Sequence, residues 1–279
     1  MTLEAEYNNR ARVPEHPQII DCWQRDAAAW REASDCELDL VYGESDRSKL
    51  DLFHPTTGRH AAPVALFVHG GYWQALDRKF FSHMARGPNA RGIAVAVASY
   101  DLCPDATVMD IVRQIRHACR WLWRRNGGIV TVYGHSAGGH LAAAMVATDW
   151  QAEDPALPAG LVPAALAISG LFDLEPLVET SINGALGLTA ETAREASPLH
   201  WTPASGARLV AAVGGDESSE YLRQSRSVCE VWAARGAETR CDVIEGTNHF
   251  TVIAGLAEPA SALTETLCDL ATGTGRPRQ

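Results

Sequence analysis

The stretch Gly134-His135-Ser136-Ala137-Gly138 places a serine between two glycines, where an apolar run gives way to an alanine-rich run. An ordinary strand-to-helix turn does not need a serine at its apex. In this position the pattern predicts a very tight turn that strains the serine backbone and lifts its hydroxyl above the carboxyl end of a sheet. A hydroxyl held in this way is suited to attack on a carbonyl carbon.

Such a serine needs two partners. Its hydroxyl is a weak nucleophile near neutral pH and needs a base, which in turn needs a group to orient it. In sites of this kind both partners follow the serine along the chain. We expect the base to be His249, in a loop after the last predicted strand, because the other downstream histidine outside the serine's helix, His200, lies in an insertion. We expect the acid to be Asp216, with its neighbour Glu217 as the alternative and Asp173 as a more distant one.

The charge that develops on the attacked carbonyl oxygen needs hydrogen-bond donors that are fixed in advance. One donor would be the amide of Ala137, the residue after the serine. The others would come from the loop His69–Trp73, with the sequence HGGYW, where glycines let the backbone approach the reacting carbonyl closely. We expect the amides of Gly71 and Tyr72 to donate, with Gly70 as the next candidate.

Aromatic residues adjoin these elements. Tyr72 and Trp73 follow the loop glycines, and Phe250 follows the expected base. We expect these three side chains to form a wall that binds an aromatic leaving group. No metal site is expected, because His135 and His140 lack the spacing of a helical zinc pair and neither belongs to an H-E-x-x-H pattern. No Walker loop or dinucleotide fingerprint occurs, so no cofactor is expected.

The elements that would position these residues indicate an α/β protein. Five nearly continuous apolar runs predict strands buried on both faces, as in a parallel sheet covered by helices. Before them, two runs separated by a polar turn predict an antiparallel hairpin. A further strand precedes the expected base. The predicted strands are Cys36–Tyr42, Lys49–His54, Pro63–Gly70, Gly92–Tyr100, Gly128–Gly134, Ala164–Gly170, Ala207–Gly215 and Thr239–Glu245.

Apolar residues at helical spacing predict helices on both sides of this sheet. No repeat or linker divides the chain, so we expect residues 1–279 to form one domain. It would have a helical N-terminal segment at 1–35 and a small cap-like insertion at 172–203, which together roof the site, and a disordered tail at 272–279. The predicted helices are His16–Ser34, Thr107–Asn126, Ala137–Asp149, Ser218–Arg235 and Glu258–Ala271.

Composition narrows the partners and the location. With 24 basic and 34 acidic residues, the chain of 279 residues has a net charge of −10, which disfavours phosphate backbones and anionic lipid surfaces. We therefore expect neither a nucleic acid nor a membrane as a partner. The first residues lack the order of a signal peptide and no apolar run approaches a membrane span, which favours a cytoplasmic location. The seven scattered cysteines form no C-x-x-C pair and indicate reduced thiols.

Taken together, these residues resemble the α/β-hydrolase superfamily, and HGG with GHSAGG is similar to the esterase branch related to hormone-sensitive lipase. Several motifs resemble the arylformamidase, or kynurenine formamidase, group more narrowly. The resemblance implies a triad of Ser136, Asp216 and His249. It also implies an α/β-hydrolase fold and hydrolysis of the formamide of N-formyl-kynurenine. The narrower motifs are HGGYW, YNNRARVPEHP (Tyr7–Pro17), SYDLCP (Ser99–Pro104), ISGLFDLEPL (Ile168–Leu177) and TNHFTV (Thr247–Val252).

We therefore expect a metal-independent serine hydrolase that removes a small acyl group from an aryl amide or ester through an acyl-enzyme. The resemblance makes N-formyl-kynurenine formamidase the first hypothesis and a carboxylesterase for short acyl esters the alternative. A third hypothesis is a non-catalytic binder on the same fold. The presence of all three triad residue types disfavours it, since such relatives typically lose one. Dimers are common in this branch, and no sequence feature decides whether this chain forms a homodimer.

Overall fold

The computed structural model describes residues 2–56 and 62–273. Its centre is an eight-stranded sheet with the strand order β1-β2-β4-β3-β5-β6-β7-β8. β1 pairs with β2, and β2 with β4, in antiparallel fashion, and the other neighbours are parallel. The predicted hairpin and parallel sheet are confirmed. The strands are β1 (Cys36–Val41), β2 (Lys49–Phe53), β3 (Val64–Val68), β4 (Ala94–Ala98), β5 (Val130–His135), β6 (Ala164–Ile168), β7 (Arg208–Gly214) and β8 (Glu238–Ile244).

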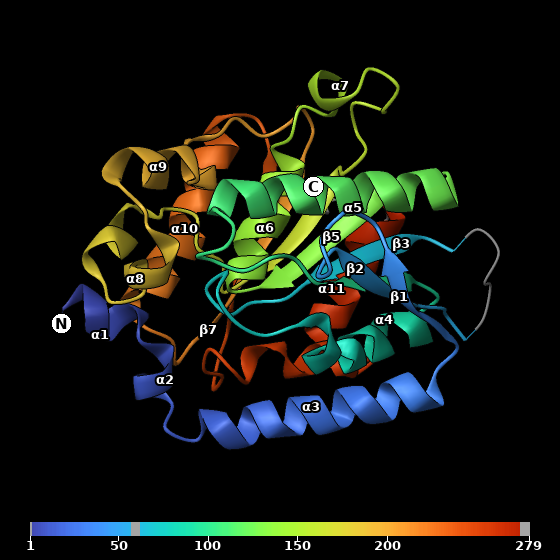
Figure 1. Cartoon of the computed structure of the whole chain (residues 1–279), viewed down its shortest axis with the longest axis horizontal. Helices are drawn as coiled ribbons and strands as arrows, with labels where there is room; N and C mark the ends of the chain where they lie inside the picture. The colour runs from blue at the N-terminus through green and yellow to red at the C-terminus, as the bar shows by residue number, and fades with distance from the viewer. Residues whose placement is uncertain (1, 57–61, 274–279) are drawn as a thin grey trace.

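Helices cover both faces of this sheet (Figure 1). The helices α5, α6 and α10 belong to one apolar core, and α3 and α11 belong to a second core on the opposite face. Strands β3 and β4 are buried at every position, as apolar runs with helices on both sides require. These long helices are α3 (His16–Ala33), α5 (Val108–Asn126), α6 (Ala137–Val146), α10 (Ser219–Ala234) and α11 (Ala262–Thr272).

Local signals set the ends of the longest helix, α5. The Thr107 hydroxyl accepts a hydrogen bond from the Asp110 amide, and the Asp110 carboxylate accepts one from the Thr107 amide, which is a capping box. The helix ends at Gly127, whose φ of 70° is a left-handed conformation that glycine adopts without strain. The amphipathic helix predicted from the sequence therefore has a defined start and stop, and its apolar face packs in the core.

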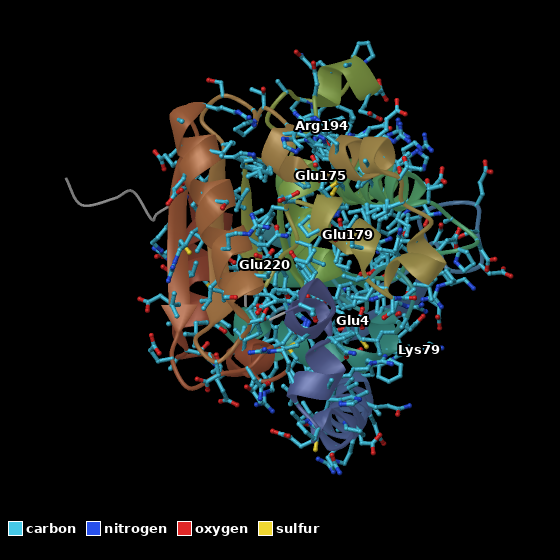
Figure 2. All side chains as sticks on the ribbon, turned by 90° about the vertical axis from the view of Figure 1, so that its left-hand side faces the viewer. Glu4, Lys79, Glu175, Glu179, Arg194 and Glu220 are labelled. Atoms are coloured by element: carbon cyan, nitrogen blue, oxygen red, sulfur yellow. The ribbon has the colours of Figure 1, made fainter. Side chains whose placement is uncertain are left out.

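Short helices were harder to predict, because three to six residues carry too little periodicity. They make up the start of the chain and most of the insertion after β6. Figure 2 shows Glu4 of the first helix, Glu175 of the insertion and Glu220 of α10 on the same side of the molecule. The short helices are α1 (Leu3–Tyr7), α2 (Asn9–Arg12), η1 (Arg78–Phe80), η2 (Ser82–Ala85), α4 (Arg86–Ala90), α7 (Trp150–Glu153), η3 (Glu175–Glu179), α8 (Asn183–Leu186), α9 (Ala190–Glu195), η4 (Pro198–His200) and η5 (Val252–Ala257).

Three further expectations concern the chain as a whole. The seven cysteines are free thiols. Within the described ranges, no helix combines the length and the apolar character needed to cross a bilayer. The expected disordered tail lies outside the described residues except for Thr272, the last residue of α11, and Gly273, which caps that helix.

Candidate active site

Ser136 lies at the turn between β5 and α6, as predicted, with a φ of 57° that is strained for a residue with a side chain. The glycines on either side make this turn feasible. A Cβ atom at Gly138 would lie 1.9 Å from the Val68 carbonyl oxygen, and one at Gly134 would lie 2.3 Å from the Gly138 carbonyl oxygen. Only glycine fits at these two positions, because α6 passes directly over the ends of the central strands.

His249 and Glu217 form a buried hydrogen-bonded pair. His249 Nδ1 lies 2.7 Å from Glu217 Oε2. Since an ionised carboxylate can only accept, the imidazole donates through Nδ1 and keeps Nε2 for another partner. Glu217 Oε1 accepts a hydrogen bond from the Gly214 amide at 2.8 Å and another from the Ser169 hydroxyl. Both carboxylate oxygens are thus fixed, and they fix the plane of the imidazole.

The expectation that Asp216 orients His249 is wrong, because Glu217 makes that contact. Asp216 is exposed, and its amide donates to the Thr247 carbonyl oxygen at 3.0 Å. The Glu217 amide instead donates to the Gly214 carbonyl oxygen at 3.2 Å, which closes a turn after β7. Because of this turn, the Glu217 carboxylate is buried and the Asp216 carboxylate is exposed to solvent. The sequence favoured Asp216 and kept Glu217 as the alternative, because both residues follow the same strand.

Two aromatic rings hold His249 from its sides. The ring centroids of Tyr221 and His249 are 4.6 Å apart, and those of His135 and His249 are 4.7 Å apart. His135 Nε2 donates to the His249 carbonyl oxygen at 2.8 Å. Burial holds the pKa of His135 well below its usual value, so this histidine is neutral and its second nitrogen is an acceptor. His135 is therefore a structural support of the loop that carries His249, a contact that the motif did not predict.

The loop after β3 runs beside Ser136. A Cβ atom at Gly70 would lie 2.9 Å from the Ser136 Cβ. Gly71 and Tyr72 both have positive φ angles, 108° and 51°. Within the described part of the chain, the amides of Gly71, Tyr72 and Ala137 donate no hydrogen bond. These three amides are therefore available to a ligand, and Gly71 and Tyr72 line the same cavity as Ser136.

His69 fixes the same loop from the other end. Its Nδ1 donates to the Gly70 carbonyl oxygen at 2.7 Å, and its ring stacks on Tyr100 with centroids 4.2 Å apart. The Tyr100 hydroxyl donates to the His69 carbonyl oxygen at 2.8 Å. Burial lowers the pKa of His69 to about 4, so the ring stays neutral at physiological pH. These contacts hold the start of the loop in place.

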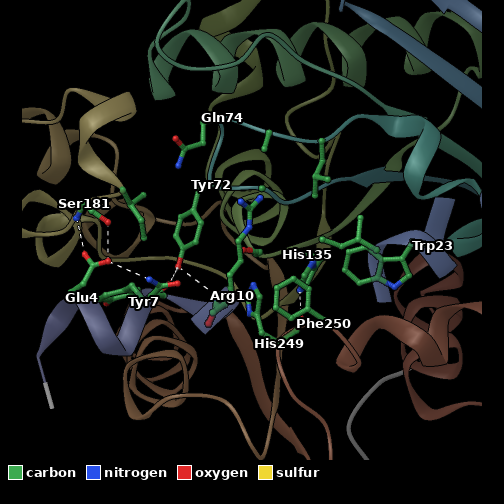
Figure 3. A pocket seen from close by; sticks show the side chains of 18 residues that line it. Glu4, Tyr7, Arg10, Trp23, Tyr72, Gln74, His135, Ser181, His249 and Phe250 are labelled. Atoms are coloured by element: carbon green, nitrogen blue, oxygen red, sulfur yellow. Dashed lines mark hydrogen bonds between the residues drawn. The ribbon is translucent and has the colours of Figure 1, made fainter. Parts of the chain in front are cut away.

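Ser136 and His249 both line a cavity of about 360 Å³ (Figure 3). The predicted aromatic residues Tyr72 and Phe250 line it as well. Trp73 does not: it is fully buried and meets the His140 ring edge-on, with centroids 5.0 Å apart. The successive positive φ angles at Tyr72 and Trp73 turn the chain between them, so that the tyrosine faces the cavity and the tryptophan enters the core.

The walls of the cavity come from segments far apart in the chain. The N-terminal segment supplies seven of the eighteen lining residues, the loop after β3 five, and the insertion two. Figure 3 shows Arg10 reaching into the space between Tyr72 and His135. The residues that line the cavity are Glu4, Tyr7, Asn8, Asn9, Arg10, Ile20, Trp23, Gly71, Tyr72, Gln74, Ala75, Leu76, His135, Ser136, Ser181, Ile182, His249 and Phe250.

A tyrosine cluster (Tyr7, Tyr72 and Tyr221, with Asn9) joins the N-terminal segment to the site. The Tyr72 hydroxyl donates to the Tyr7 carbonyl oxygen at 2.6 Å and lies 2.7 Å from the Tyr221 hydroxyl, to which Asn9 Nδ2 donates at 2.9 Å. Burial raises the pKa of Tyr221, and hydrogen bonds with Tyr72, Asn9 and Ser136 oppose this rise. Tyr221 also lies against the His249 ring, so the cluster adjoins the candidate base. Sequence reasoning missed it, because its members belong to four separate elements.

One cluster among the described residues has the composition of a metal site. Ligand atoms of Asp173, Glu175 and His200 lie within 4.8 Å of one another. Asp173 is paired with Arg223 at 3.3 Å and Glu175 with Arg194 at 3.2 Å. The carboxylates therefore already have cationic partners, and none of these residues lines the cavity that holds Ser136.

Comparisons with known proteins agree with this geometry. The family described as BD-FAE matches residues 50–177. Kynurenine formamidase of Salmo salar is 32% identical over 238 residues, which cover 82% of this chain and 80% of that protein. Kynurenine formamidase of Danio rerio is 28% identical over 244 residues, which cover 85% of this chain and 82% of that protein.

Solved structures share the fold. A structure from a Silicibacter species with a provisional thioesterase description has a TM-score of 0.85 and 34% identity, over 96% of this chain and 99% of that one. An esterase of Pyrobaculum calidifontis has a TM-score of 0.72 over 92% of each chain, and its 18% identity supports the fold alone. The chain is thus a hydrolase of the α/β-hydrolase fold, and it belongs to the kynurenine formamidase family.

Proposed function

We propose that the chain is a serine hydrolase that removes the formyl group from an aryl formamide, with N-formyl-kynurenine as the substrate. The observation that carries this proposal is a buried serine and a buried histidine at one cavity, with a buried carboxylate behind the histidine. Ser136 is 2% exposed and His249 5% exposed, and both open onto the same space, with Glu217 on the far nitrogen of the imidazole. Relatives named kynurenine formamidase match most of the chain.

In the first half of the proposed reaction, Ser136 Oγ attacks the formyl carbon and His249 Nε2 takes the hydroxyl proton. Glu217 stabilises the imidazolium through the hydrogen bond to Nδ1. The negative oxygen is held by the free amides of Gly71, Tyr72 and Ala137, which need no rearrangement to donate. The C–N bond then breaks, and His249 returns its proton to the leaving aryl amine. The product at this stage is a formyl ester of Ser136.

In the second half, water attacks the formyl ester while His249 accepts its proton. The bond between the formyl carbon and Ser136 Oγ breaks, the serine regains its proton from His249, and formate leaves. The same oxyanion donors serve both steps. The cavity supplies an aromatic surface for the leaving group through Tyr72, Phe250 and Trp23.

The second candidate is a carboxylesterase for short acyl esters. A rice protein named as a probable isoprenylcysteine methylesterase is 26% identical over 76% of this chain. An ester needs the same nucleophile, base and oxyanion donors as a formamide. The difference lies in the acyl group, because a site shaped for formyl excludes longer chains, whereas an open site loses only about 1 to 3 kcal/mol for each methylene of mismatch.

The test compares kcat/KM on N-formyl-kynurenine with kcat/KM on aryl acetate and aryl butyrate. We expect the formamide to be the best substrate and butyrate the worst, because a formyl pocket leaves no room for a propyl chain. Equal or better turnover of the longer esters would remove the formamidase assignment and leave the esterase. Ser136→Ala, checked for an unchanged melting temperature, is the control for hydrolysis at the expected site.

The same variant separates an enzyme from a non-catalytic binder on this fold. We expect an organophosphate to label the wild type at one site per chain and to leave Ser136→Ala unlabelled, since only an activated serine reacts. A folded wild type that is not labelled at all would favour the binder.

A further inference from the structure

Arg10 places a guanidinium group without a protein partner among the described residues at the cavity. It is exposed on α2, and it forms no hydrogen bond or ion pair with the residues that the structure describes. Its side chain extends into the cavity between Tyr72 and His135 (Figure 3). Among the described residues that line this cavity, it is the one arginine, and there is no lysine.

The carboxylate of Glu4, which lines the same cavity, already has hydrogen-bond partners. Both carboxylate oxygens of Glu4 accept hydrogen bonds from Ser181, one from its amide and one from its hydroxyl, each at 2.8 Å. These bonds lower the pKa of Glu4, so its charge persists at neutral pH. The Glu4 carboxylate thus joins α1 to the insertion and does not pair with Arg10. The N–H groups of the Arg10 guanidinium remain available to a ligand.

The backbone that carries Arg10 is held in place. Its neighbour Asn9 donates to the Tyr221 hydroxyl at 2.9 Å, and the carbonyl oxygen of Tyr7 accepts from Tyr72 at 2.6 Å. Tyr221 also packs against the His249 ring. The same cluster thus connects the backbone of α2 to the residues around His249, and it holds the base of the Arg10 side chain in place.

We propose that Arg10 binds a carboxylate on the leaving group, so that the site selects aryl formamides that carry an acidic side chain over neutral ones. This inference rests on the proposed function. It adds to that function the substrate group that the site recognises, which is a carboxylate on the leaving group. A guanidinium offers paired N–H donors that match the two oxygens of a carboxylate. A carboxylate bound there would occupy the mouth of the cavity while the formamide reaches Ser136.

The experiment uses two substrates that differ only at the α-carboxyl group, N-formyl-kynurenine and its α-carboxamide, which is uncharged at that position. For the wild type we expect kcat/KM to be about 10- to 100-fold higher for the acid. Arg10→Met keeps the apolar stem and removes the charge. It should abolish this preference by raising KM for the acid, and leave the carboxamide within about twofold. Added salt should reduce the preference in the wild type only.

Arg25→Met is the matched control, because Arg25 is an exposed arginine on α3 that does not line the cavity. It should retain the full preference. Two results would overturn the inference: a wild type without a preference for the acid, or an Arg10→Met enzyme that loses activity equally on both substrates.

A binding measurement keeps this inference separate from the proposed function. The Ser136→Ala protein is titrated by calorimetry with kynurenine and with its carboxamide, and the titration is repeated with Arg10→Met added. Tighter binding of the acid that disappears with Arg10→Met supports the carboxylate site even if the wild type does not hydrolyse the formamide. Hydrolysis without any such difference in binding supports the proposed function and removes the carboxylate site.

Discussion

At the residue scale, two adjacent carboxylates have opposite environments. Glu217 is buried, and its oxygens accept from His249, Gly214 and Ser169. Asp216 is exposed beside it. A carboxylate fixed by three donors can hold the imidazole in one tautomer and stabilise its protonated form. A solvated carboxylate one residue away cannot replace it without a change in the turn after β7.

This difference predicts opposite results for two amide substitutions. Glu217→Gln should lower kcat by about 10³- to 10⁴-fold, because the amide can present its NH₂ group to His249 and favour the wrong tautomer. Asp216→Asn should leave kcat within about twofold. Steady-state kinetics on one aryl ester measures both, with melting temperatures as the check on folding. A large loss in Asp216→Asn with little loss in Glu217→Gln would reverse the assignment.

At the scale of elements, the site depends on how closely α6 approaches the strands. The contact is made by backbone alone, since Gly138 lies against the carbonyl of Val68 at the end of β3. The same approach sets the strained φ of Ser136 and brings the loop after β3 beside it. The glycines around the serine therefore serve the packing of three elements as well as the serine turn itself.

A methyl group added at Gly138 should push α6 away from the end of β3. Gly138→Ala would place its Cβ 1.9 Å from the Val68 oxygen, and we expect a loss of about 3 kcal/mol or more in the free energy of unfolding, together with loss of activity. Gly184→Ala on α8 is the control, because an added Cβ there meets nothing within 4 Å. It should be neutral or slightly stabilising in chemical denaturation. Equal stability of the two variants would contradict the packing argument.

At the scale of the whole molecule, several buried histidines are kept neutral. Burial lowers the pKa of His69, His83 and His140 to about 4 each. In the unfolded chain these groups take up protons near pH 6.5. Between about pH 6.5 and pH 4 the unfolded state therefore binds more protons than the folded state, and the free energy of unfolding falls as the pH falls.

This linkage predicts a measurable slope. Each such histidine contributes up to about 1.4 kcal/mol per pH unit in that window. His140→Gln can keep the hydrogen bond to the Ala196 carbonyl oxygen, which His140 Nε2 makes at 2.7 Å, but it cannot titrate. Urea denaturation between pH 7.5 and pH 4.5 should show a shallower loss of stability in this variant than in the wild type. Between pH 7.5 and pH 8.5 the free energy of unfolding should depend on pH in the same way in the two proteins. The same pH dependence in both proteins below pH 6.5 would contradict the buried neutral state.

Much of the fold could be predicted because its signals are local. Nearly continuous apolar runs marked the five strands from β3 to β7, a polar turn between two short runs marked the hairpin of β1 and β2, and helical patterns marked α3, α5, α6, α10 and α11. The short helices of the N-terminal segment and the insertion lack such a period, so their individual bounds could not be predicted, although a helical N-terminal segment was expected. The choice between Asp216 and Glu217 was also beyond local signals, because it depends on one turn after β7.

The sequence by itself determined the type of chemistry, because the strand, the glycines and the serine of GHSAGG are contiguous and their geometry follows from local sterics. It also pointed to His249 and to the glycine loop, which lie at strand ends. Only the tertiary structure decided which carboxylate meets His249, which aromatic residues face the cavity, and that Arg10 reaches it. Those contacts depend on the turn after β7 and on the packing of the N-terminal segment against the ends of the strands, which local signals in the sequence do not specify.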